Sequence, residues 1–113
     1  MDLYEDIVKL MDELTKSIKV LKNNGAELAE CEKEYKITLR TEALRLRADN
    51  TPVTLINQII YGVPGVAELR LKRDIAQAKY EANKEHINVT KLKLRVLENQ
   101  LQREWGASGK GDL

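Results

Sequence analysis

The stretch NTPVTLINQIIYGVPG, residues 50–65, decides the fold, because it holds both prolines and two of the six glycines of a 113-residue chain. Thr51 followed by Pro52 is typical of a helix start, with an N-cap residue and then proline at the first helical position. Gly62 is well placed to end that helix, and Pro64 can open another. The stretch therefore predicts a short helix over residues 52–61 between two longer elements.

Long runs of helix-forming residues flank this stretch, over residues 2–49 and 66–105. At about 1.5 Å per residue, each run would form a helix of roughly 60–70 Å. We expect an all-α fold: helices over 2–49 and 64–105 packed as a long antiparallel hairpin with the short helix at the turn. Residues 1–105 are predicted to form a single helical domain, followed by a flexible tail over 106–113.

The first run contains one internal breaker, Asn23-Asn24-Gly25. A full turn there would give a bundle of four elements or let the chain fold back into a compact monomer. Apolar residues nevertheless recur every seventh position across the breaker, at Ile7, Leu14, Leu21, Leu28 and Tyr35. This unbroken phase favours a kink within one helix over a turn.

Composition excludes several classes of function. The chain is 33% charged with a net charge of +1, and no apolar run is long enough to cross a membrane. One cysteine and one histidine cannot build a zinc or di-iron site, so we expect no metal and no cofactor. The lone Cys31 fits a reducing compartment, which predicts a cytoplasmic protein without membrane contact. No set of side chains supplies nucleophile, base and oxyanion donors together, so we expect no enzyme.

Apolar residues recur at steps of three and four along both runs, which is the spacing of one helix face. In the first run they are Ile7, Leu10, Met11, Leu14, Ile18, Leu21, Leu28, Cys31, Tyr35, Leu39 and Leu46. In the second run they are Ala76, Tyr80, Ile87, Leu94, Leu97 and Leu101, with Asn83 and Thr90 among them. Asn83 could fix the helix register or the oligomeric state, as buried asparagines do in helical interfaces.

A second apolar stripe in the second run is expected to lie beside the first and to widen its apolar face. It consists of Leu71, Ile75, Ala78, Ala82, Val89, Leu92 and Val96. A two-helix hairpin cannot bury two stripes, and the natural remedy is self-association into a helical bundle, most simply a homodimer. The expected interface residues are Leu71, Ile75, Val89, Leu92 and Val96. Docking of a different protein on this stripe is the alternative.

Basic residues concentrate near the expected turn, with net charges of +3 over residues 35–47 and +5 over residues 70–103. An antiparallel hairpin would gather six of them there: Arg40, Arg45, Arg47, Arg70, Lys72 and Arg73. Such a patch could bind nucleic-acid phosphates or an acidic partner, because guanidinium groups match phosphate oxygens. The alternative is a solvated face with ion pairs within one helix, such as Glu68 with Lys72 and Arg70 with Asp74.

Isolated residues are predicted to have structural roles. Trp105 is expected to clamp the open end of the hairpin by reaching Tyr4, Ile7 and Val8. His86 is expected to be a surface or packing residue, and Cys31 to be buried apolar filler.

Six segments have a familiar arrangement: YKITLR (35–40), ALRLR (43–47), PVTLI (52–56), VAELR (66–70), KRD (72–74) and LENQLQREW (97–105). Together they resemble a group of small helical proteins that phages and prophages of Gram-positive bacteria encode. The resemblance covers about residues 26–105. It implies a phage accessory protein acting in the host cytoplasm, and it carries over no catalytic or binding residues, since the group has no assigned activity.

Two functions remain open from the sequence. One is a helical protein-interaction module that presents its turn to a host or phage protein through Val53, Ile56, Ile59 and Ile60. The other is a nucleic-acid-binding module that uses the six basic residues. Balanced charge and few stacking aromatics, four Tyr and one Trp, favour the interaction module.

Overall fold

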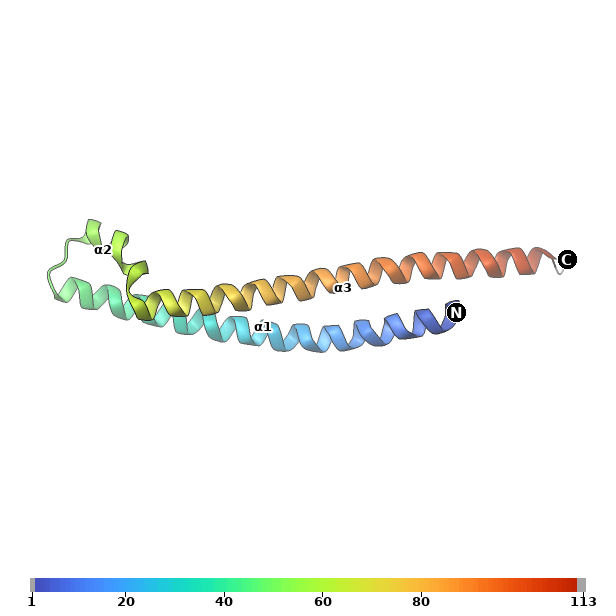
Figure 1. Cartoon of the computed structure of the whole chain (residues 1–113), viewed down its shortest axis with the longest axis horizontal. Coiled ribbons are helices and arrows are strands. Elements are labelled where there is room, and N and C mark those ends of the chain that lie inside the picture. The colour runs from blue at the N-terminus through green and yellow to red at the C-terminus, as the bar shows by residue number, and fades with distance from the viewer. Residues whose placement is uncertain (1, 112–113) are drawn as a thin grey trace. The chain divides into compact units, whose positions relative to one another are not determined.

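The computed structural model describes residues 2–111, with side chains described for residues 2–106. The elements in chain order are helix α1 (Leu3–Ala48), helix α2 (Val53–Ile59), the 3₁₀ turn η1 (Ile60–Gly62) and helix α3 (Pro64–Gly111), as Figure 1 shows. Helix makes up 94% of the structure, and the described part of the chain contains no strand. The prediction of an all-α fold with two long helices and a short helix at the turn is confirmed.

The structure decides between the alternatives for α1 and moves the end of α3. Helix α1 is continuous through Asn23-Asn24-Gly25, so the alternative of a full turn at this place is wrong. Helix α3 continues to Gly111, beyond the end predicted at Trp105. Residues 106–111 contain no proline, and a glycine costs a helix only about 1 kcal/mol relative to alanine, so nothing in this segment forces the helix to stop. Residues 112–113 of the predicted tail lie outside the described residues.

Contacts divide the chain into two compact units. Unit 1 combines the residues of α1 up to Lys22 with the residues of α3 from Ala82 onward. Unit 2 comprises Asn23–Glu81, including α2 and η1. In unit 2 the ion pairs Glu27–Lys79 and Glu34–Lys72 show that α1 and α3 run antiparallel.

In unit 2 the buried and half-buried positions advance by alternate steps of four and three along both long helices. On α1 they include Asn24, Leu28, Cys31 and Tyr35, and on α3 they include Val66, Leu69, Arg73, Ala76 and Tyr80. This alternation is the spacing of a coiled-coil seam, in which each side chain packs among residues of the facing helix. The seam accepts polar groups, since Asn24 is buried in it.

Unit 1 continues the same spacing, with the expected residues on α3 and a partly different set on α1. The seam positions are Ile7, Leu10, Leu14, Ser17 and Leu21 on α1, and Asn83, Ile87, Thr90, Leu94, Leu97 and Leu101 on α3. Met11 and Ile18 were expected on this face, but both are exposed because each lies one position beyond a seam residue. The Asn83 Nδ2 donates a hydrogen bond to the backbone carbonyl of Ser17 at 3.3 Å, which fixes the register of the two helices.

That register also corrects the expected role of Trp105. Its side chain is 74% exposed, so the predicted clamp on Tyr4, Ile7 and Val8 is wrong. Because Asn83 lies opposite Ser17, Ile7 lies opposite roughly residue 93, ten residues further along α3. Trp105 therefore lies beyond the position on α3 that pairs with the start of α1 at Leu3.

Helix α1 ends in a Schellman motif centred on Asn50, which has a left-handed φ of 63°. The Thr51 N–H donates to the Leu46 carbonyl at 3.0 Å, and the Asn50 N–H donates to the Arg47 carbonyl at 3.0 Å. These two bonds satisfy carbonyl groups that a helix end would otherwise leave unpaired. Asparagine is one of the few residues besides glycine that adopts this conformation readily.

The next helix starts at a different residue from the one predicted. Pro52, with φ −58° and ψ 139°, is the N-cap of α2 in place of Thr51. Thr51 is instead the last residue of the α1 cap, because its N–H closes the Schellman motif. The expectation for Pro64 is met, since α3 begins at that proline.

Candidate functional site

An uncharged connection, residues 50–67, joins the two long helices in a chain that is one-third charged. Helix α2 and turn η1 pack on the end of α1 through Ile56 and Ile60, which form a buried cluster with Leu46. Leu39 and Ala43 pack against this cluster from α1. The connection is therefore anchored to α1 by an apolar core as well as by the backbone cap at Asn50.

The uncharged connection also exposes large apolar side chains to solvent. Val53 is 63% exposed, Leu55 42%, Ile59 39% and Tyr61 45%. Of the four predicted partner-contact residues, Val53 and Ile59 are thus available, whereas Ile56 and Ile60 are buried and hold the connection in place. Leu55 and Tyr61 are also exposed and were missed as candidate contacts, because a stretch that is apolar throughout does not reveal which residues pack inward.

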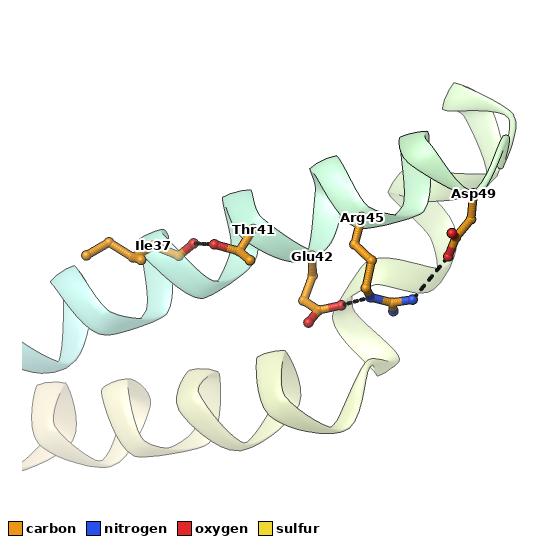
Figure 2. A network of polar contacts seen from close by, with 5 residues as sticks. All are labelled: Ile37, Thr41, Glu42, Arg45 and Asp49. Carbon is orange, nitrogen blue, oxygen red and sulfur yellow. Dashed lines mark hydrogen bonds and ion pairs between the residues drawn. The ribbon is translucent and has the colours of Figure 1, made fainter.

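The basic residues near the turn are largely engaged with other groups. The Arg45 Nε donates to Glu42 Oε2 at 2.7 Å, and its Nη1 donates to Asp49 Oδ2 at 3.3 Å, as Figure 2 shows. The hydrogen bond to Glu42 raises the pKa of the Arg45 guanidinium. Arg45 therefore belongs to a surface network within α1 and its cap, which agrees with the alternative of a solvated helix face.

Arg73 is similarly engaged on α3. Its Nε and Nη2 both donate to Asp74 Oδ1, at 3.1 and 2.8 Å, and this hydrogen bonding raises the pKa of its guanidinium. The same group lies 4.5 Å from the centre of the Tyr35 ring, an arrangement that favours a cation over an aromatic face. Arg73 thus acts within the seam of unit 2, where its long side chain covers Tyr35.

The remaining basic residues do not form one patch with these. Lys72 pairs with Glu34 at 3.8 Å in place of Glu68, and the Arg70 guanidinium lies 5.0 Å from the Tyr61 ring centre. Residues 72 and 73 lie opposite residues 34 and 35 of α1. Arg45 is about three helical turns further along α1, so it is distant from Lys72 and Arg73. Arg40 and Arg47 are the two of the six without an ion pair or ring contact among the described residues. The expected cluster is therefore spread along unit 2.

A second exposed apolar surface lies on α3. The expected self-association residues Leu71 and Ile75 are each 60% exposed, Val89 is 39%, Leu92 57% and Val96 61%. In unit 1, this surface borders an open groove of about 410 Å³, lined by Leu10, Val89, Leu92, Lys93, Val96 and Leu97. We call Leu71, Ile75, Ala78, Ala82, Glu85, Val89, Leu92 and Val96 the outer stripe.

The outer stripe is rotated from the seam around the axis of α3. Each of its members lies two positions after a seam residue of α3, and two residues rotate a helix by about 200°. The stripe is therefore turned away from the seam, yet in unit 1 its residues Val89, Leu92 and Val96 line one groove together with Leu10 of α1. Helix α3 thus has an exposed apolar surface that adjoins the covered seam in unit 1.

Other kinds of site are not apparent in the described residues. Within residues 2–106, no three His, Cys, Asp or Glu side chains come together in a way that could hold a metal ion. None of the described helices combines the length and the apolar character that crossing a membrane requires. Comparisons with protein-family models, with curated proteins and with solved structures found no match to this chain.

Proposed function

We propose that the protein is a non-enzymatic helical interaction module that binds another protein through the exposed side of its uncharged connection. The observation that carries the proposal is the exposure of Val53, Leu55, Ile59 and Tyr61 on a segment anchored by buried residues. A soluble protein normally exposes large apolar side chains singly, so four of them on one short, anchored segment favour a binding role over incidental exposure.

The pattern of anchoring supports this proposal over a disordered loop that happens to be apolar. Pro52 and Pro64 restrict the backbone at both ends of the short helix, and Ile56 and Ile60 fix its rotation against α1. A surface held in one conformation loses little entropy when a partner binds. The role as a phage accessory protein in a host cytoplasm rests on the sequence resemblance.

The nucleic-acid alternative receives less support from the geometry. Three of the six basic residues have carboxylate partners, Arg45, Lys72 and Arg73, and these would have to be given up for phosphate contacts. Phosphate binding gains most where several unpaired cations converge on one surface. Here the basic residues are spread along unit 2.

The test is recovery of a partner from lysate of infected or lysogenic Gram-positive cells, with nuclease and without it. The variants are Val53→Glu with Ile59→Glu, and, as a matched control, Gln58→Glu. Gln58 is exposed on the same short helix, so its replacement adds a negative charge without removing apolar surface. We expect the same partner with and without nuclease, retained by the control and lost by the double variant. Recovery that nuclease abolishes, or that both variants retain, would refute the proposal.

A further inference from the structure

The groove of unit 1 is formed by residues of that unit alone. Leu10 contributes to it from α1, and the α3 residues that line it are Val89, Leu92, Lys93, Val96 and Leu97. Its volume is about 410 Å³, and its residues Val89, Leu92 and Val96 are 39–61% exposed. The groove is therefore an open apolar surface within a single unit.

The spacing of the groove residues matches the side chains of a helix. Val89 and Val96 are separated by about two helical turns, or about 10 Å, and Leu92 lies between them. A helix laid along the groove repeats its own apolar side chains at the same interval. Amphipathic helices bind in open apolar grooves of this kind, burying one face and leaving the other in water. The groove therefore favours a helix over a small molecule, which needs a site that encloses most of its surface.

The charged residues of α3 along the groove are all positive. Within residues 86–97 they are Lys91, Lys93 and Arg95, and none of the three has an ion pair among the described side chains. Lys93 lines the groove, and Arg95 lies on the other edge of its apolar residues, because about 200° of helix rotation separates the two. Unpaired cations beside an apolar surface attract a partner that has carboxylates at the edge of its own apolar face, and they repel a basic one.

The acidic residues of unit 1 limit where those carboxylates can lie. Asp6 and Glu13 are about one helical turn before and after Leu10 on α1, and neither lines the groove. On α3 the nearest acids, Glu85 and Glu98, lie beyond the two ends of the groove residues. The carboxylates of a partner are consequently expected above α3, and the edge of the partner that faces α1 is expected to be uncharged or basic.

A second copy of the chain fits this groove less well than an acidic helix does. If two such grooves faced each other about a two-fold axis, residues 91, 93 and 95 of one copy would meet the same cations of the other in either direction of pairing. Like charges placed opposite each other in an interface weaken binding. Docking of a different protein on Val89, Leu92 and Val96 is therefore favoured over self-association through them.

We propose that the groove of unit 1 binds an acidic amphipathic helix of another protein, whose apolar face covers Val89, Leu92 and Val96. One carboxylate of the bound helix pairs with Lys93, and another lies near Arg95. The groove is separate from the uncharged connection, so this inference goes beyond the proposed function and gives the module a second binding surface.

Two synthetic peptides of three heptads test the proposal. The first has Leu at heptad positions a and d, Glu along one edge and Gln along the other, and the second is identical except that Lys replaces Glu. Fluorescence anisotropy measures the dissociation constant of each labelled peptide with the full chain, at low and at high salt. We expect the acidic peptide to bind roughly tenfold more tightly than the basic one, with a difference that shrinks as salt rises. Equal binding of the two peptides, or no binding of the acidic one, would overturn the proposal.

Variants of the groove separate its apolar part from its charged part. Leu92→Ala should weaken binding of the acidic peptide roughly tenfold, because it removes apolar surface that the peptide covers. Lys93→Glu with Arg95→Glu should reverse the preference, so that the basic peptide binds more tightly. The matched control is Gln77→Glu, an exposed position in unit 2, which should change neither dissociation constant. An unchanged preference in the charge-reversed variant would contradict the proposal.

Two controls distinguish the groove from other surfaces of the chain. The variant Val53→Glu with Ile59→Glu should bind the acidic peptide normally, so a failure of the uncharged connection and a failure of the groove are told apart. Loss of peptide binding in this variant would place the peptide on the uncharged connection and count against the groove. Leu92→Ala should leave the sedimentation equilibrium of the chain unchanged. A dimer that Leu92→Ala disrupts would assign the groove to a second copy and overturn the proposal.

Discussion

Gly25→Ala should stabilise the protein, although Asn23-Asn24-Gly25 has the composition of a turn. Gly25 lies inside α1, and its φ is not positive, so alanine can adopt its backbone conformation without strain. Glycine loses more backbone freedom than alanine when a helix forms, which makes alanine better by about 1 kcal/mol within a helix.

The surroundings of the new methyl group decide the size of the effect. A Cβ at Gly25 would lie 3.4 Å from Tyr80 Cε2 and 3.9 Å from Tyr80 Cδ2, at the short end of ordinary van der Waals contact. The methyl group therefore fits against the ring edge without displacing it, and the gain from helix propensity is largely kept. We expect the free energy of unfolding to rise by about 0.5–1 kcal/mol.

Urea denaturation followed by circular dichroism at one fixed protein concentration measures this change, since self-association would otherwise shift the midpoint. Gly65→Ala is the control, because a Cβ there meets nothing within 4 Å and the site lacks any ring contact. A lower midpoint for Gly25→Ala, with the control unchanged or raised, would show that α1 requires glycine beside Tyr80 and would refute the reasoning.

Three further outcomes are expected. Ile60→Ala should lower the free energy of unfolding by about 2–4 kcal/mol, because it opens a cavity against Leu46. In the same urea titration, Val53→Ala at an exposed position should change the free energy of unfolding by less than about 0.5 kcal/mol. Only glycine is free of strain at the φ of 63° that residue 50 adopts. Asn50→Gly should therefore leave the free energy of unfolding unchanged or raise it by up to about 1 kcal/mol, and Asn50→Val should lower it by about 1–2 kcal/mol. Thermal melts of both variants measure these changes. Duplex DNA should bind with a dissociation constant weaker than about 100 µM at physiological salt, and fluorescence anisotropy that shows micromolar, steeply salt-dependent binding would contradict this.

Sequence reasoning succeeded where the local chemistry is decisive. Two prolines and two glycines within residues 50–65 locate the short helix, because these residues restrict or free the backbone wherever they occur. The sevenfold phase through residues 23–25 favoured a kink within one helix over a full turn, and α1 is indeed one helix, since a packed seam outweighs the local preference of two asparagines and a glycine.

It failed where the answer depends on how two helices align. Met11 and Ile18 are apolar and lie next to the seam, but both are exposed, and the seam contains Ser17 where Ile18 was expected. The position of a residue around the helix therefore determines its burial more strongly than its hydrophobicity does. The predicted roles of Trp105 and of the basic residues depended on the register of α1 against α3. The hydrogen bond from Asn83 to Ser17 reveals this register in unit 1, and the ion pairs reveal it in unit 2.

The absence of charge from residues 50–67 has a consequence for the speed of binding. Long-range attraction accelerates association only when charges on the two partners face each other. A protein that docks on the uncharged connection would be steered only by charges at its edge, such as Arg70 beside Tyr61, so we expect a rate constant near the ordinary value of about 10⁵–10⁶ M⁻¹ s⁻¹. Differences in affinity among its partners would then arise in how long each complex lasts, and hence in how well each partner's surface fits the exposed side of a single short helix.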